Sequence, residues 1–294
     1  MLKTLRQTFT KFSEDECPRL AAALAYYAIF SLPALLVLVV AIASFFADRE
    51  QVTGGLTSFF EDSLGKTGAQ QMETMLVQSN QRGQGLWGTI VGFVMLGVGA
   101  SGVLLELQTA LNRAWGVEPD PKQGGVKTFI FKRGLSLAMV MGIAFLLLVS
   151  LVFSWLLGEF GSIVHQWVPA ALSGGVLNVL DVLASLTIIA LLFAAMLKFL
   201  PDVQLAWRDV WAGAVLSTVL FALGKYALST YLSWSDVTSA YGAAGSLALV
   251  LLWIYYSAMI FFLGAEFTQV LTTNRGKRVA PEAGATASAA AKAT

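Results

Sequence analysis

Six stretches of this 294-residue chain are long and apolar enough to cross a lipid bilayer. The hydrocarbon core of a bilayer is about 30 Å thick, and about 20 helical residues cross it. Because lipid offers no partner to backbone N–H and C=O groups, such stretches must be helices or strands of a closed barrel. Their continuous rather than alternating apolar character favours helices. The predicted spans are approximately Leu20–Phe46, Leu86–Leu107, Leu135–Leu157, Val176–Leu197, Val210–Tyr231 and Ala243–Leu271.

The composition agrees with a membrane protein, because 56% of the residues are apolar and only 13% are charged. Soluble domains carry about 25% charged residues. The first apolar run begins after 19 residues and is longer than the core of a signal peptide. We therefore predict a retained first span, with a cleaved signal as the alternative. The predicted fold class is all-α: a polytopic membrane helical bundle with six transmembrane helices.

Lysine and arginine residues are distributed unevenly between the two sides of this predicted bundle. Four precede the first span, five follow the second, two follow the fourth and four lie in the tail, so fifteen of the 19 share one side. The other side holds three in its long loop, and Lys225 lies inside the fifth span. Because basic residues are retained on the cytosolic side, both termini are predicted to be cytosolic.

Three segments flank or interrupt the membrane domain predicted for residues 20–271. Residues 1–19 place their leucine and phenylalanine side chains on one helical stripe, beside basic residues. This pattern predicts a cytosolic amphipathic helix that either lies in the interface of an anionic inner leaflet or packs on the bundle. The outer loop at about 47–85 has apolar residues at helical spacing, which predicts one or two short helices. The tail, 272–294, lacks apolar periodicity and is predicted to be disordered.

Small residues at a spacing of four mark places where membrane helices approach closely. Gly88 and Gly92 have this spacing in the second span, and Gly213 and Ser217 have it in the fifth. Plain packing is the simpler interpretation of both pairs. A pathway lined by backbone is the alternative.

Pro33 lies inside the first predicted span. It cannot donate a hydrogen bond to the carbonyl of Ile29, so the helix is expected to bend there. The bend is either a static feature or a candidate hinge.

Ionisable residues inside a membrane are costly, and they usually face a partner or water. We expect Glu106, Glu266, Lys198 and Arg113 to lie at similar depth near the cytosolic face, where they could form one cluster. Asp181 and Lys225 are expected to share a depth nearer the outer face and to pair. Structural ion pairs with snorkelling side chains are one interpretation, and a substrate or ion pathway is the other.

Several kinds of chemistry are disfavoured by what the chain lacks. One cysteine, Cys17, and one histidine, His165, do not provide the converging ligands of a zinc hydrolase, so no metal or cofactor is expected. Cys17 is expected to be an unmodified thiol, with acylation as the alternative. No phosphate-binding glycine-rich loop is present. A net charge of +1 provides no general field for nucleic acid. We therefore expect a protein that is not an enzyme.

Four stretches of the chain resemble the YihY/BrkB family of bacterial inner-membrane proteins, which includes a virulence factor and was formerly mislabelled as ribonuclease BN. Together they span most of residues 15–271. They are LAAALAYYAIFSLP at 20–33, NRAWGV at 112–117, LPDV at 200–203 with WRDVWAGA at 207–214, and YGAAGS at 241–246 followed by WIY at 253–255 and GAE at 264–266.

The resemblance implies a multi-pass protein of the bacterial inner membrane with a role in the envelope. It also implies a link to lipid traffic, so membrane lipids are the expected partners, with an envelope protein or a second copy as further partners. The leading hypothesis is a protein that transports lipid, assists that transport or maintains envelope integrity. The alternatives are an ion-coupled carrier of small solutes and a scaffolding protein without flux.

Overall fold

The computed structural model of the protein describes residues 2–43, 48–82, 99, 102–119, 170–234, 237–277, 279–282 and 284–288, and this part of the chain is mostly helical. The helices are α1 (Leu2–Glu14), α2 (Cys17–Ala43), α3 (Arg49–Arg82), α6 (Ala170–Phe199), α7 (Trp207–Trp234) and α8 (Val237–Asn274), with a further helical segment at 102–114. Two short strands, β1 (Val117–Pro119) and β2 (Ala285–Ala287), pair antiparallel.

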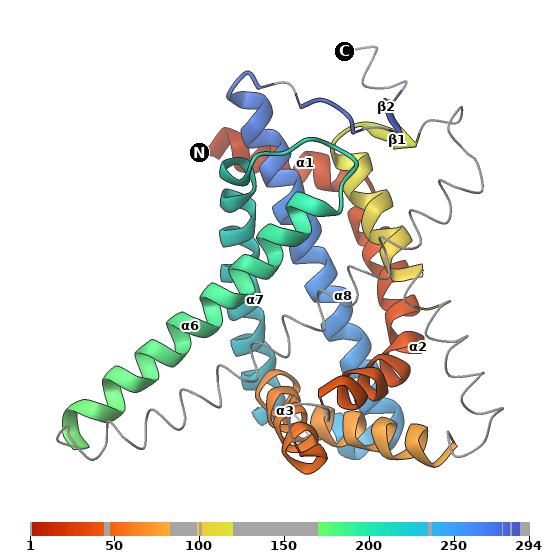
Figure 1. Ribbon diagram of the computed structural model, residues 1–294, viewed down its shortest axis with the longest axis vertical. Coiled ribbons are helices and arrows are strands. Elements are labelled where there is room, and N and C mark those ends of the chain that lie inside the picture. The colour runs from red at the N-terminus through yellow and green to blue at the C-terminus, as the bar shows by residue number, and fades with distance from the viewer. Residues whose placement is uncertain are drawn as a thin grey trace.

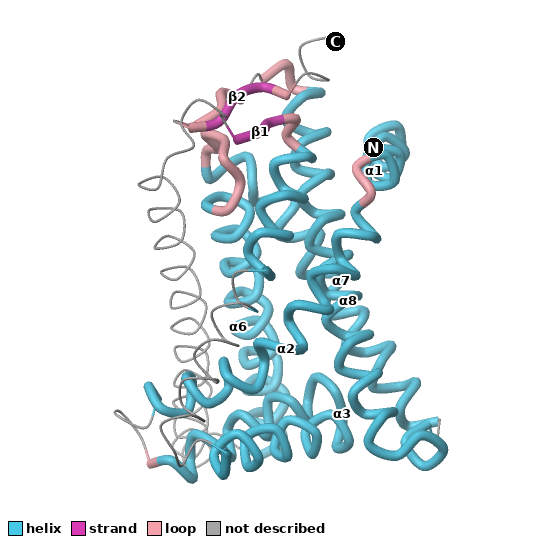
Figure 2. The backbone as a smooth tube through the Cα atoms, turned by 90° about the vertical axis from the view of Figure 1, so that its right-hand side faces the viewer, coloured by secondary structure: helices cyan, strands magenta, loops and turns pink. Residues whose placement is uncertain are grey.

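The long helices form an elongated bundle whose centre is α8 (Figure 1). Helix α8 packs against α2 and α7, and α6 packs against α7. Helix α1 lies across one end of the bundle and α3 across the other, as both views show (Figure 2). The strands β1 and β2 lie at the same end as α1.

Four of the predicted spans coincide with helices of the structure, namely α2, α6, α7 and α8. Among the described residues, two helical stretches, Trp207–Leu228 and Leu247–Asn274, are long and apolar enough to cross a membrane. Most of the second predicted span and all of the third lie outside the described residues. The helical class of the chain is therefore confirmed, and the number of spans stays a prediction.

The contact between α7 and α8, which we call the α7–α8 seam, is close because small residues face each other. A Cβ atom added to Gly213 would collide with the carbonyl oxygen of Gly264 and the hydroxyl of Thr268. The hydroxyl of Ser217 donates to the carbonyl of Ile260 at 3.1 Å. The prediction that Gly213 and Ser217 mark a packing face is confirmed.

The described buried side chains of α6 lie in its C-terminal half. The buried side chains that the structure describes on this helix are Ala190, Phe193, Ala194 and Leu197. The centre of the Phe193 ring lies 6.0 Å from the centres of the Phe221 and Phe261 rings. Towards its beginning α6 leans away from α7 (Figure 1), and the side chains of Val182 and Leu183 are 56% and 55% exposed.

Pro33 lies in the interior of α2, whose lower part turns aside from its upper part (Figure 1). The missing N–H of Pro33 supplies a physical cause for a bend. Nearby, the hydroxyl of Ser31 donates to the carbonyl of Ala28 at 3.1 Å. The role of Pro33 as a hinge stays a prediction.

Two segments differ from the sequence-based expectations in their secondary structure. Helix α3 is a single element of 34 residues where one or two short helices are predicted. The tail is ordered in its described part rather than disordered, because its backbone is paired. Gln204 donates to the carbonyl of Ala280 at 3.0 Å, Glu282 donates to that of Asp202 at 2.9 Å, and β2 pairs with β1. Such backbone pairing needs no apolar periodicity in the side chains.

Candidate functional site

A fully buried carboxyl group, that of Glu266, lies near the C-terminal end of α8, beside the start of α2. The side chain has no exposed area, and α8 is apolar over most of its length. Burying a charge without a paired or hydrogen-bonded partner is strongly unfavourable. The surroundings of Glu266 therefore decide what this group can do.

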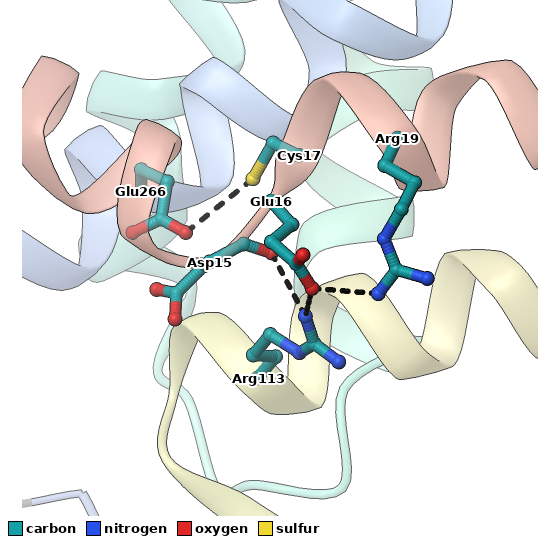
Figure 3. Close-up of polar contacts among 6 residues, drawn as sticks. All are labelled: Asp15, Glu16, Cys17, Arg19, Arg113 and Glu266. Atoms are coloured by element: carbon teal, nitrogen blue, oxygen red, sulfur yellow. Dashed lines mark hydrogen bonds and ion pairs between the residues drawn. The ribbon is translucent and has the colours of Figure 1, made fainter.

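The turn between α1 and α2 supplies the nearest polar neighbours of Glu266 (Figure 3). The thiol of Cys17, at the start of α2, donates to Oε1 of Glu266 at 3.7 Å. Among the described residues, Oε2 of Glu266 has no hydrogen-bond partner. The half-buried carboxyl group of Asp15 also lies within hydrogen-bonding reach of the Glu266 carboxyl group, and two carboxyl groups so placed can share a proton.

The arginines of this region bind a different carboxylate. Oε2 of Glu16 accepts hydrogen bonds from Arg113 at 2.8 Å and Arg19 at 2.6 Å. Arg113 also donates to the backbone carbonyl of Asp15 at 3.3 Å. Glu16 has a φ of 54°, a left-handed conformation that turns the chain between the two helices. Both arginines are therefore paired with the exposed Glu16, and no salt bridge to Glu266 occurs within the described residues.

The two acids of the turn are shifted in opposite directions. Burial raises the pKa of Asp15 above its ordinary value, although a hydrogen bond with Glu266 and the charges of Lys11 and Arg113 oppose the shift. Hydrogen bonds from Arg113 and Arg19 lower the pKa of Glu16. Burial, with the nearby carboxyl groups, raises the pKa of the Cys17 thiol, which therefore keeps its proton and remains a donor.

The same end of the bundle holds a second polar connection, between segment 102–114 and the chain that links α6 to α7. The side chain of Asn112 donates to Oδ2 of Asp202 at 2.9 Å and accepts from the backbone N–H of Asp202 at 2.8 Å. The carboxylate of Asp209 accepts a hydrogen bond from the backbone N–H of Ala206 at 3.3 Å, and this bond caps the start of α7. Asp209 also forms an ion pair with Lys277. We call this end of the bundle the polar end. It consists of the α1–α2 turn, the contact between Asn112 and Asp202, the start of α7 and the described residues between 275 and 288.

The structure does not join the predicted inner cluster of charges into one site. Arg113 binds Glu16, and Lys198 donates to the carbonyl of Leu205 with its ammonium group 6.0 Å from the centre of the Phe199 ring. Glu106 is half-buried on segment 102–114. Only Glu266 of the four is fully buried.

The predicted pair of Asp181 and Lys225 is not tested. Asp181 lies in α6, and its side chain falls outside the described part of the chain. Lys225 is half-buried in α7.

The arrangement around Glu266 is suited to holding a proton rather than a metal ion. Among the described residues, no group of three His, Cys, Asp or Glu side chains is placed to hold a metal. Two neighbouring carboxyl groups, one buried and one partly exposed, can take up and release a proton.

Sequence reasoning missed the surroundings of Glu266, which are the residues of the α1–α2 turn. Asp15 and Glu16 precede the predicted first span and carry no apolar context, and Cys17 was expected to be a plain thiol. The acidic run Glu14-Asp15-Glu16 directly before a membrane span is the one signal that singles them out. Asn112 and Asp202 both lie in stretches that resemble the family, so their interaction could have been suspected from those stretches.

The comparisons with known proteins cover almost the whole chain. The family described as "Virulence factor BrkB" matches residues 8–289. A "UPF0761 membrane protein" of Azotobacter vinelandii is 28% identical over 94% of this chain and 65% of its own length. One of Methylibium petroleiphilum is 30% identical over 90% of this chain and 60% of its own. The chain thus spans just under two thirds of the length of these relatives. No solved structure matches it.

Proposed function

Since the chain belongs to the Virulence factor BrkB family and its relatives are membrane proteins, we propose that it transports lipid across the inner membrane of a bacterium or assists that transport. The protein crosses the membrane six times in this proposal, with both termini in the cytosol. The uneven distribution of lysine and arginine supports this orientation. The polar end then faces the cytosol.

The observation that carries the proposal is the change from exposed to buried side chains along the described part of α6, from residue 182 to residue 199. This helix is anchored by Phe193, Ala194 and Leu197, whereas Val182 and Leu183 are exposed. In a bilayer, exposed apolar side chains face acyl chains at no cost. Where the exposed part of α6 separates from its neighbour, an acyl chain can enter. Scaffolding alone does not call for such an exposed part.

Helix α7 supports the same proposal, because one of its faces is turned to lipid. Exposed apolar and aromatic side chains recur every four residues along it, while Val210, Ala214 and Ser217 are buried. The exposed residues are Trp207, Trp211, Val215, Val219 and Leu223. The two tryptophans lie at the end of the helix that is proposed to face the cytosol, where aromatic residues anchor spans in the interface.

The test is a reconstitution of the purified chain into vesicles that carry a fluorescent phospholipid in both leaflets. A membrane-impermeant quencher then reports how fast lipid from the inner leaflet reaches the outer one. We expect faster exchange than in protein-free vesicles. Equal rates, together with unchanged lipid distribution in cells that lack the protein, would contradict the proposal.

A second candidate function, an ion-coupled carrier, is favoured by Glu266. A buried ionisable residue in a membrane span marks ion or proton pathways in many transporters. Solute uptake that requires a pH gradient, and that is lost in Glu266→Gln, would favour this candidate over lipid movement.

Lipid is also the proposed partner of α1. Phe9 and Leu5 are exposed on this helix, and so are Lys3 and Arg6, whereas Thr8 is buried against the bundle. The helix therefore combines both alternatives that its sequence leaves open. It packs on the bundle with one face and offers an apolar and basic face to an anionic leaflet.

A further inference from the structure

We propose that Glu266 is a proton-binding residue, which holds a proton in the folded protein at neutral pH and exchanges it with water through the carboxyl group of Asp15. The inference goes beyond lipid transport, because it concerns the resting protein and holds whichever cargo the protein moves. It starts from a geometric fact: Glu266 is fully buried and its Oε2 has no partner among the described residues.

The ionised form of Glu266 has little to stabilise it. Among the described residues, the donor that reaches it is a thiol, which is a weak donor, at 3.7 Å. A buried carboxylate needs a cation or several strong donors. A protonated carboxyl group in the same place is neutral, so the burial that disfavours the ion does not disfavour the acid.

The charged groups around Glu266 do not change this conclusion. On α1, Lys11 forms an ion pair with Glu14 at 3.2 Å. From segment 102–114, Arg113 binds Glu16, and Arg19 of α2 binds the same carboxylate. These cations are engaged by exposed acids, and the remaining neighbour, Asp15, carries the same sign of charge as an ionised Glu266.

Asp15 is the group through which the proton can leave. It lies in the turn between the buried Glu266 and the surface, and it is itself half-buried. In the exchange step the O–H bond of Glu266 breaks as an O–H bond forms on the Asp15 carboxylate, which then releases the proton to water. Cys17 keeps its own proton throughout and continues to donate to Oε1. Burial, which raises the pKa of Asp15, makes that group a better proton acceptor.

The test is infrared spectroscopy of the purified protein in micelles of a detergent without ester groups, which detects the C=O stretch of protonated carboxyl groups. We expect such a band at neutral pH in the wild type and its loss in Glu266→Gln. Glu16→Gln is the matched control, because Glu16 is exposed and bound to two arginines, and it should keep the band. Asp15→Asn should keep the band but slow its shift after transfer to D2O several-fold.

Two results would overturn the inference: absence of the band at neutral pH, or its persistence in Glu266→Gln. Should Glu266→Gln fail to fold, wild-type protein labelled with 13C in its glutamate side chains decides the question. A protonated band that moves on this labelling supports Glu266, and a band that does not move belongs to aspartate and refutes it. Neither measurement requires transport, so failure of the lipid proposal leaves this test intact.

Discussion

The α7–α8 seam and the polar end both bury polar atoms, but they differ in how many of these atoms have a hydrogen-bond partner. At the seam, the hydroxyls of Ser217, Tyr256 and Thr268 each donate to a carbonyl at 2.8 to 3.1 Å. At the polar end, Oε2 of Glu266 is buried without a partner within the described residues. A region whose polar atoms find partners, as these three hydroxyls do, is stabilised by them. A region that retains a buried carboxyl group without a donor can still bind and release a proton. The unfavourable free energy of burying that group is offset by the packing around it.

The largest expected effect tests the seam. Gly213→Ala places a methyl group against the backbone of Gly264, which cannot move as a side-chain end can. We expect a loss of about 3 kcal/mol in the free energy of unfolding, which is the upper part of the range for overpacking. Thermal unfolding in detergent, followed by tryptophan fluorescence, measures it.

The matched control for Gly213→Ala is Gly54→Ala in α3, where an added Cβ meets nothing within 4 Å. That change should stabilise the protein by about 0.5 kcal/mol, because alanine loses less backbone entropy in a helix. Similar destabilisation in both variants would mean that the seam is not a tight contact.

The next effect in size concerns the polar end, at the buried Asn112. Asn112→Ala removes both of its hydrogen bonds to Asp202 and leaves the Asp202 N–H without that acceptor. The expected loss is about 2 kcal/mol. Asn274→Ala is the control, since Asn274 donates to Gln7 at 3.0 Å from an exposed position. A cost for Asn274→Ala equal to that for Asn112→Ala would show that burial does not set the strength of these contacts.

The seam and the polar end also differ in how well the sequence predicts them. Hydropathy is a local property, so it identified the helices α2, α6, α7 and α8, and spacing identified the Gly213 and Ser217 face. Glu266 was singled out because an ionisable residue inside an apolar run is conspicuous.

The partners of Glu266 could not be predicted in the same way. They depend on a turn at Glu16 in which a residue other than glycine has positive φ, and on where that turn meets α8. The expected cluster with Lys198 and Arg113 failed to form because both cations found nearer partners, a carbonyl and Glu16. Depth in a membrane brings side chains to one level, but it does not say which of them face each other.

A smaller effect is the pH dependence of the α1–α2 turn, in which two adjacent acids should act with opposite signs. The pKa of Asp15 is raised, so its contribution to stability is full below its ordinary pKa of 3.8 and is lost as the pH rises through the folded-state pKa. The pKa of Glu16 is lowered, so its contribution is full above its ordinary pKa of 4.5 and is lost as the pH falls through the folded-state pKa.

Unfolding temperatures across this pH range separate the two acids. Asp15→Asn should gain stability relative to wild type as the pH rises, and Glu16→Gln should approach wild type as the pH falls. The same trend in both variants would refute the assignment of burial to Asp15 and ion pairing to Glu16.

The smallest effect on stability is expected at α1. Substitutions there test whether this helix lies on the membrane surface. Phe9 is 60% exposed, and Thr10, also exposed, lies about 100° further round the helix. In nanodiscs with anionic lipid, a thiol in Phe9→Cys should react with a membrane-impermeant maleimide more slowly than one in Thr10→Cys. The native Cys17 is buried and stays unlabelled.

The difference between positions 9 and 10 should shrink in zwitterionic lipid and at high salt, because Lys3 and Arg6 then lose their attraction to the leaflet. Equal labelling of both positions in anionic lipid would mean that α1 stands clear of the membrane. Protection of position 9 that depends on protein concentration rather than lipid charge would instead place a second copy of the chain on this face.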